Sequence, residues 1–291
     1  MRAFEVVETG PLALIQDLGR PGYAHLGVPP SGALDVPALK LANRLVGNDE
    51  AAAGIESLFG GLKLRAKTSC TVAVTGPAVA VGVDGRGVGS HAPIHLAAGQ
   101  LVTMGMPATG LRCYLAVSGG IAADSELGSR SRDVLSEIGP APLRAGDVLP
   151  IGTPSGVPGG ADVVLPSVAP AELVVPIEPG PRAHWFDGLE SGLAKTWTVT
   201  AESNRVGLRL DGTPLARERE YAEQELPSEG LLTGAVQVPP NGLPVVFLAD
   251  HPTTGGYPVA AVVRQASLQA LAQARPGTLL RFHSSTRVWN R

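Results

Sequence analysis

The chain has 291 residues and 44% hydrophobic residues, enough for one or two domains with a substantial buried core. Its 37 Gly and 26 Pro residues disfavour long helices without reaching the proportion typical of disordered chains. The formal charge of -3 with scattered Lys and Arg argues against a nucleic-acid partner, and no apolar run approaches membrane-spanning length, so we expect a cytoplasmic protein.

Short alternating apolar segments recur along the whole chain and predict the strands of a barrel or sandwich. They are bounded by Gly, Pro, Asn or Asp, which favour turns. The predicted strands are Phe4–Val7, Leu12–Ile15, Thr71–Thr75, Ile94–Leu96, Leu101–Met104, Cys113–Val117, Thr196–Thr200, Val245–Ala249 and Leu279–Phe282. The only two cysteines, Cys70 and Cys113, lie inside apolar runs, where a free thiol usually packs as a small hydrophobe.

Helical signals are few. Asp35 can cap a helix that has Pro37 in its first turn and runs to Val46, since a carboxylate accepts from free N–H groups there and Pro fits that turn. A second short helix is predicted from Ser267 to Ala274, before a Pro-Gly pair that ends it.

Residues 153–171 are rich in chain-breaking residues and predict a linker. This linker would join an N-terminal β domain, residues 1–152, to a C-terminal β domain, residues 172–291. Three sequence patterns occur once in each half: Arg144–Ile151 with Arg275–Phe282, Val28–Gly32 with Val238–Gly242, and Gly61–Arg65 with Gly207–Asp211. These repeats favour two similarly built domains in tandem.

Most familiar catalytic motifs are absent from the sequence. There is no Walker A loop and no Gly-x-Ser-x-Gly motif. The glycine cluster at Asp84–Gly89 lacks the spacing of a dinucleotide fingerprint and predicts a β-turn. Pro93 separates His91 from His95 and bars a helix that would present both to one ion, so we expect no bound metal.

A long polar loop precedes the first predicted helix. Asp17, Arg20 and Ser31 lie in it, and loops on rigid β scaffolds commonly carry binding groups. We therefore treat these three residues as one candidate substrate-binding cluster. The alternative is that Asp17 and Arg20 form a structural ion pair and that Ser31 is only a turn residue.

A second candidate cluster is the run Thr253, Thr254, Gly255, Gly256 and Tyr257. It offers two hydroxyls, and backbone N–H groups at glycines, which a ligand can approach closely. Such a nest suits a carboxylate, a phosphate or a polarised amide oxygen. A tight β-turn without a ligand is the alternative. No nucleophile or general base can be named from the sequence.

Seven stretches of the chain resemble the allophanate hydrolase subunit 2 family, also called the biotin-dependent carboxyltransferase or Kip antagonist family. They are residues 16–35, 43–49, 115–121, 127–133, 203–212, 228–242 and 249–263. The chain departs from the family pattern at Val206 and Leu208, and at His251 and Pro252. The resemblance implies two tandem cyclophilin-like β-barrel domains with few short helices.

The resemblance also implies a function. Stand-alone bacterial members act as the C component of an ATP-dependent 5-oxoprolinase, which opens the lactam of 5-oxo-L-proline to L-glutamate. The implied partners are an allophanate hydrolase subunit 1 family protein (the B component), which would cover an apolar surface patch, and the lactam hydrolase (the A component). The assembled complex would use ATP, while this chain would bind no cofactor tightly and be inactive alone. Two alternatives are a carboxyltransferase component of a urea carboxylase-like system and a regulatory protein that sequesters an inhibitor of a sensor kinase.

Overall fold

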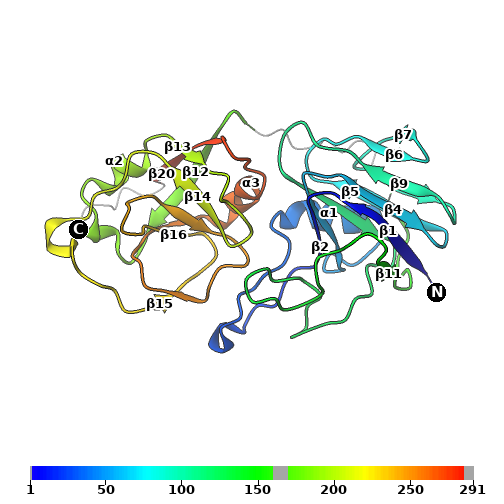
Figure 1. Ribbon diagram of the computed structural model, residues 1–291, viewed down its shortest axis with the longest axis horizontal. Helices are drawn as coiled ribbons and strands as arrows, with labels where there is room; N and C mark the ends of the chain where they lie inside the picture. The colour runs from blue at the N-terminus through cyan, green and yellow to red at the C-terminus, as the bar shows by residue number, and fades with distance from the viewer. Residues whose placement is uncertain (1, 160–169, 285–291) are drawn as a thin grey trace. The chain divides into compact units, whose positions relative to one another are not determined.

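The computed structural model describes residues 2–159 and 170–284. They form two compact units, one of residues 2–20 with 31–159 and one of residues 21–30 with 170–284. Both units consist mainly of short strands with few helices (Figure 1), so the predicted mainly β class is confirmed. Within the expected linker, residues 160–169 lie outside the described residues.

The first unit contains two sheets and one long helix. One sheet has the strand order β11-β1-β4-β9-β6-β7 and the other has the order β2-β3-β10-β5-β8. The strands are β1 (Ala3–Thr9), β2 (Leu12–Gln16), β3 (Gly54–Leu58), β4 (Leu62–Ala66), β5 (Cys70–Thr75), β6 (Val81–Val83), β7 (Arg86–Val88), β8 (Ile94–Leu96), β9 (Leu101–Met104), β10 (Arg112–Val117) and β11 (Val148–Pro150).

Strand β10 lies between β3 and β5 in its sheet and is buried on both faces. Successive side chains of a strand point to opposite faces. Cys113 and Leu115 therefore pack into the main core of the unit, while Tyr114 and Ala116 pack against the helix α1. Both cysteines are buried, as predicted.

Helix α1 (Val36–Leu45) begins where the sequence predicts. The side chain of Asp35 accepts a hydrogen bond of 3.1 Å from the backbone N–H of Ala38, and Pro37 lies in the first turn. The remaining helices are short. They are α2 (Leu189–Leu193), α3 (Leu268–Ala272) and the 3₁₀-helices Ala24–Leu26, Ala183–Trp185, Arg219–Tyr221 and Gln265–Ser267.

The second unit is built around a closed barrel with the strand order β12-β19-β16-β17-β14-β13-β20. Its strands are β12 (Glu172–Pro179), β13 (Trp197–Val199), β14 (Gly207–Asp211), β16 (Ala235–Gln237), β17 (Val245–Phe247), β19 (Val259–Val263) and β20 (Leu279–Ser284). A separate two-stranded sheet joins β15 (Glu229–Gly230) to β18 (Thr254–Gly255). Because the barrel is closed, β12 and β20 pair with each other and no edge strand is left with unpaired backbone groups.

The two segments that resemble each other at the ends of the halves form strands with different pairing. β11 pairs with β1 in the antiparallel direction, whereas β20 pairs with β12 in the parallel direction. The sequence repeat therefore predicts where the last strand of each half occurs. It does not predict whether that strand pairs in the parallel or the antiparallel direction. No helix within the described ranges is long and apolar enough to cross a membrane.

Candidate functional site

The second predicted cluster follows a buried ion pair. The Arg205 guanidinium makes two hydrogen bonds to the Asp250 carboxylate, 2.8 Å from Nε and 3.1 Å from Nη2. The two side chains are 3% and 0% exposed, and the backbone N–H of Asp250 also donates to the Arg205 carbonyl. Bidentate charged pairs of this kind restrict both partners. The start of the segment that leads to Thr253 is therefore fixed.

Thr254 and Gly255 form strand β18 and adopt neither the nest nor the tight turn that the sequence suggests. They face Gly230 and Glu229 of β15 in an antiparallel ladder. Gly255 and Gly256 do not have positive φ angles, so conformational freedom does not explain the glycines here. Pairing with a segment more than twenty residues away decides the local conformation, and local sequence does not reveal such pairing.

Close packing explains Gly255. A Cβ atom there would lie 2.8 Å from Nε2 of Gln237 and 2.8 Å from Cδ1 of Leu231. The same Gln237 Nε2 donates a 2.9 Å hydrogen bond to the backbone carbonyl of Tyr257. Gly255 thus lets a buried amide reach across the segment and fix the position of Tyr257.

The hydroxyl groups of this cluster are free. Among the described residues, neither Thr253 nor Thr254 uses its hydroxyl in a hydrogen bond to the protein, and Thr254 is exposed. The Tyr257 side chain is 46% exposed. Donors without protein partners are available to a ligand. The binding role of the five residues stays a prediction. It is better supported for their hydroxyl groups than for their backbone N–H groups.

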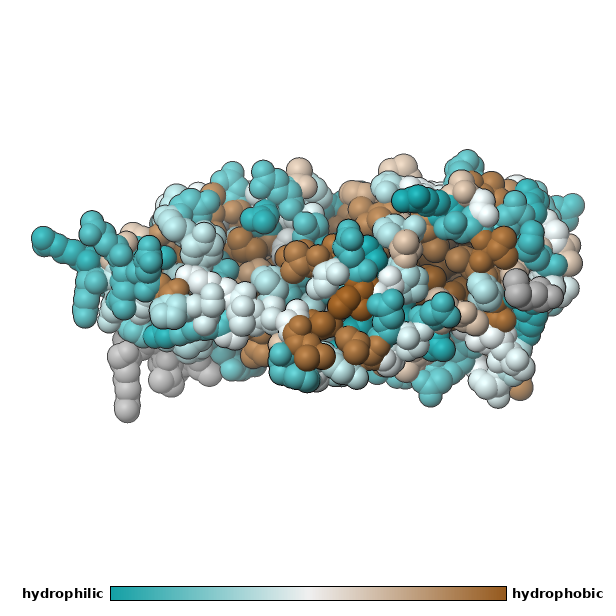
Figure 2. Space-filling model, turned by 60° about the horizontal axis from the view of Figure 1, so that its bottom comes forward, coloured by the Kyte–Doolittle hydropathy of each residue, from teal (hydrophilic) through white to brown (hydrophobic). Residues whose placement is uncertain are grey.

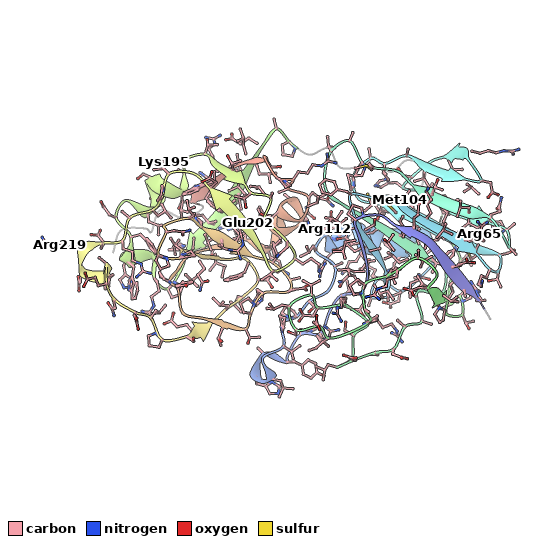
Figure 3. The ribbon with its side chains drawn as sticks, viewed as in Figure 1. Arg65, Met104, Arg112, Lys195, Glu202 and Arg219 are labelled. Atoms are coloured by element: carbon pink, nitrogen blue, oxygen red, sulfur yellow. The ribbon has the colours of Figure 1, made fainter. Side chains whose placement is uncertain are left out.

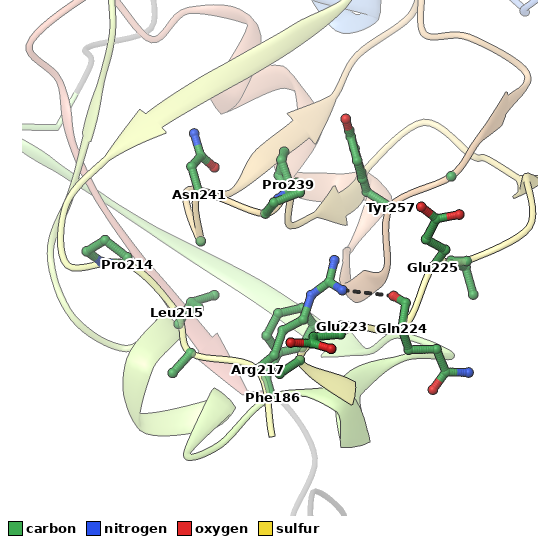
Figure 4. Close-up of a pocket in the computed structure, with 16 residues that line it drawn as sticks. Phe186, Pro214, Leu215, Arg217, Glu223, Gln224, Glu225, Pro239, Asn241 and Tyr257 are labelled. Atoms are coloured by element: carbon green, nitrogen blue, oxygen red, sulfur yellow. Dashed lines mark hydrogen bonds between the residues drawn. The ribbon is translucent and has the colours of Figure 1, made fainter. Parts of the chain in front are cut away.

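Gly256 and Tyr257 line a cavity of about 610 Å³ in the second unit (Figure 4). The other lining residues are one residue before α2, a stretch between β14 and β15, and the loop after β16. They are Phe186, Pro214, Leu215, Ala216, Arg217, Ala222, Glu223, Gln224, Glu225, Leu226, Pro239, Pro240, Asn241 and Gly242. Clefts of this volume hold small organic ligands in other proteins.

Arg217 is the only cation among the residues that line this cavity, and sequence reasoning missed it. Its Nη1 donates to the backbone carbonyl of Gln224 over 3.2 Å. Its Cζ lies 5.7 Å from the ring centroid of the buried Trp185, a favourable cation–π distance. In the sequence Arg217 belongs to an alternating Arg-Glu run, a pattern typical of a solvated surface, so no local signal sets it apart.

Trp185 also connects the cavity to strand β15. The guanidinium of Arg182 lies 5.6 Å from the same ring centroid and forms a hydrogen-bonded ion pair with Glu229 on β15. The Glu229 carboxylate raises the pKa of Arg182. Glu229 faces Gly255 across the ladder, so the aromatic contact, the ion pair and the ladder form one connected support for the cavity wall.

In the first unit, the Asp17 carboxylate is fully occupied by protein donors. It accepts hydrogen bonds from Gly19 N (2.8 Å), Ser129 Oγ (2.6 Å), Arg130 N (2.6 Å) and Ser131 Oγ (2.6 Å). Asp17 is 7% exposed. Hydrogen bonds to the ionised form stabilise a buried carboxylate. We call this arrangement the Asp17 joint; it holds the loop after β2 to residues 129–131.

Arg20 and Ser31 differ from Asp17. Arg20 pairs with backbone carbonyls, donating to Ser131 and Glu126, and not with Asp17, so the suggested ion pair does not form between these described residues. Its Nη1 is buried without a partner, as is the hydroxyl of Ser31. Ser31 has φ +53°, a strained conformation for a residue with a Cβ. The binding role of this cluster stays a prediction. The groups that could contact a ligand are Nη1 of Arg20 and the hydroxyl of Ser31, because the Asp17 carboxylate is already hydrogen-bonded.

A buried network that the sequence did not predict lies beside α1. The Tyr114 hydroxyl donates to Glu56 Oε2 over 2.7 Å and accepts from the Asp35 N–H. Leu34 N also donates to Glu56, and Arg112 pairs with it at 3.6 Å; Figure 3 labels Arg112. Burial raises the pKa of Tyr114 well above its usual value. The network connects the loop before α1 to β3 and β10.

The segment from β6 to β8 contains the predicted glycine turn and the histidines His91 and His95. Asp84 and Gly85 connect β6 to β7 with φ angles of +49° and +80°, as expected of a two-residue hairpin turn, so the predicted turn is confirmed. His91 is buried and its Nε2 lies 3.0 Å from the Gly76 carbonyl. Within residues 2–159 and 170–284, no three His, Cys, Asp or Glu side chains are placed to hold a metal ion.

Comparison with known proteins gives consistent matches over almost the whole chain. Residues 26–284 match the family described as "Carboxyltransferase domain, subdomain A and B". The C component of the 5-oxoprolinase of Escherichia coli is 37% identical over 283 residues, which is 96% of this chain and 90% of that protein.

Two solved structures are similar as well. The protein TTHA0988 superimposes with a TM-score of 0.88 and 35% identity over 98% of this chain. The urea carboxylase of Kluyveromyces lactis superimposes with a TM-score of 0.90 and 30% identity, again over 98% of this chain. The chain spans 56% of the first of these proteins and 27% of the second.

Proposed function

The chain belongs to the family of carboxyltransferase domains with subdomains A and B, and on that premise we propose that it is the C component of an ATP-dependent 5-oxoprolinase. The reaction is the opening of the 5-oxo-L-proline lactam to L-glutamate. The observation that carries this proposal is the 37% identity to the 5-oxoprolinase C component of Escherichia coli, which extends over 96% of this chain and 90% of that relative.

Lactam opening needs fixed donors around an oxygen on which negative charge develops. Thr253 and Thr254 supply hydroxyls that no described residue occupies, and Tyr257 lies at the adjoining cavity. The fixed support through Glu229 and Arg182 limits the motion of these donors. Donors that are already in place cost little reorganisation during the reaction, which is what stabilises a transition state.

We expect the isolated chain to be inactive and to need two partners, an allophanate hydrolase subunit 1 family protein (the B component) and a lactam hydrolase (the A component). Figure 2 shows hydrophobic residues in brown areas of the surface among hydrophilic ones. Large apolar side chains that are exposed include Met106 (72%), Leu232 (69%) and Leu26 (60%). Exposed apolar surface supports a partner interface.

A carboxyltransferase component of a urea carboxylase-like system is the second candidate. It is favoured by the TM-score of 0.90 against the Kluyveromyces lactis urea carboxylase. Both reactions place an amide oxygen among polar donors, so the same site serves either. That reaction also requires biotin carboxylase and carrier domains.

The decisive experiment is co-expression with both partner proteins, the lactam hydrolase and the subunit 1 family protein, followed by measurement of glutamate release from 5-oxo-L-proline. We expect release only when ATP and all three proteins are present. Glutamate release from the isolated chain would contradict the need for partners. No release from the full complex, together with urea-dependent carboxyl transfer when a biotinylated carrier is supplied, would replace the proposal by the second candidate.

A further inference from the structure

The cavity in the second unit contains a cation that lacks a counterion. Arg217 uses Nη1 to bind backbone carbonyls of Tyr221 and Gln224. Its Nε and Nη2 have no hydrogen-bond partner among the described residues, and no described carboxylate lies within ion-pair distance of it. Arg182, the other arginine at Trp185, is paired with Glu229. Of these two arginines, only Arg217 has no carboxylate partner among the described residues and can pair with an anionic ligand.

The free N–H groups of Arg217 have the geometry that suits a carboxylate. Nε and Nη2 lie on one edge of the planar guanidinium, so their N–H groups point in parallel toward one ligand. Carboxylates accept such paired donors in a bidentate arrangement. The bonds from Nη1 and the contact with Trp185 fix the opposite edge, and Figure 4 shows the guanidinium among the lining residues of the cavity.

The other residues that line the cavity determine which size and polarity of ligand fits. Part of the other wall is apolar, with Phe186, Leu215, Leu226 and Pro239 among its residues, and part is polar. The apolar part can contact the hydrocarbon body of a small ligand. The volume of about 610 Å³ admits a single small ring and leaves space for water.

Neutral polar groups complete the site. The side-chain oxygen of Asn241 accepts from Leu243 N over 3.1 Å, which leaves its NH₂ group free to donate. The Tyr257 hydroxyl has no protein partner among the described residues. Both groups suit an amide, which presents one acceptor and one donor. The carboxylates of Glu223 and Glu225, which also line the cavity, oppose ligands with several negative charges.

We propose that this cavity binds a small cyclic monocarboxylate that also carries an amide, with its carboxylate held by Arg217 and its amide beside Asn241 and Tyr257. A five-membered lactam acid has these features. The identification of that acid as 5-oxo-L-proline rests on the proposed function. The carboxylate specificity itself rests on the guanidinium of Arg217, whose Nε and Nη2 have no partner among the described residues.

The test is calorimetric titration of the purified chain with 5-oxo-L-proline and with 2-pyrrolidinone, which has the same ring without the carboxylate. We expect saturable binding of the acid and binding of the neutral lactam that is at least about 10-fold weaker, since a hydrogen bond between charged groups is worth more than a factor of ten. Arg217→Gln should reduce binding of the acid to the level of the neutral lactam, and Arg217→Lys should keep part of it.

Arg219→Gln is the matched control. Arg219 lies two residues away in the 3₁₀-helix Arg219–Tyr221, is exposed and points away from the unit (Figure 3). It should bind the acid as the natural chain does. Absence of saturable binding, equal binding of both lactams, or full binding by Arg217→Gln with an unchanged unfolding midpoint would each overturn the proposal.

The reconstituted complex separates this proposal from the proposed function. Glutamate release with an unchanged KM in a complex that carries Arg217→Gln would overturn the cavity assignment and leave the 5-oxoprolinase function intact. If no complex releases glutamate while the chain still binds the acid through Arg217, the proposed function is wrong and the carboxylate site stands.

Discussion

The Asp17 joint and the Thr253–Tyr257 segment both contain hydroxyl side chains. Their hydrogen bonding is opposite. The hydroxyls of Ser129 and Ser131 are buried and bound to Asp17, whereas those of Thr253 and Thr254 are free among the described residues. Polar density in a loop therefore does not identify a binding site. The number of donors left without a protein partner is the better criterion.

The largest effect is expected at the buried pair Arg205–Asp250 of the second unit. Asp250→Ala leaves a buried guanidinium without its carboxylate and should lower the free energy of unfolding of that unit by about 3–5 kcal/mol. Urea unfolding measures the loss. The matched control is Glu172→Ala, which removes an equally bidentate but exposed pair with Arg281 and should cost less than about 1 kcal/mol. Equal losses in the two variants would contradict the role assigned to burial.

Two neighbouring glycines sharpen the comparison within the segment itself. Gly255→Ala brings a Cβ to 2.8 Å from Gln237 and Leu231, and overpacking of this kind costs about 1–3 kcal/mol. At Gly256 the nearest atom to such a Cβ is the Leu226 carbonyl oxygen at 3.3 Å, so Gly256→Ala should cost less than about 1 kcal/mol. Thermal unfolding of both variants checks the order. A larger loss at Gly256 would show that packing at Gln237 is not the constraint.

The strands and the helix α1 could be predicted from the sequence because their signals are local. Alternation gives β8 and β9 at their observed bounds, and Asp35 with Pro37 places the start of α1. The β15–β18 ladder was missed because it pairs residues that only the fold brings together. For the same reason the sequence does not show that Ser129, 112 residues away, donates a hydrogen bond to Asp17. It also does not show that Arg217 lies in a cavity wall.

A smaller effect concerns pH and the first unit. Burial lowers the pKa of His91 below its usual 6.5, so the folded state favours the neutral ring. Stability from this group is present above the unfolded pKa and is lost as pH falls toward the folded pKa. His91→Asn, which tolerates the φ of +58°, should make stability less dependent on pH below 6.5. A pH dependence in His91→Asn equal to that of the natural chain would contradict this account.

The smallest expected effect concerns how readily a reagent in solution reaches the core of the first unit. Burial raises the pKa of the Cys70 thiol to about 11, so little thiolate forms at pH values near neutrality. A thiol-specific reagent should therefore modify the native chain slowly and the urea-unfolded chain quickly. Rapid modification of Cys70 in the folded chain would show that this core opens readily and would contradict the burial of the thiol.

The central claim is that the free donors of the second unit serve the reaction while the occupied donors of the first unit serve the fold. Its most direct test measures turnover of the reconstituted complex and the unfolding midpoint of the chain for Thr254→Val and Ser129→Ala. Thr254→Val should keep its midpoint and lose on the order of 100-fold in turnover, as expected for loss of one positioned donor. Ser129→Ala should unfold more easily, by about 1–3 kcal/mol, with normal turnover per folded molecule. Normal turnover in Thr254→Val, with a large loss of turnover in Ser129→Ala at an unchanged midpoint, would contradict the claim.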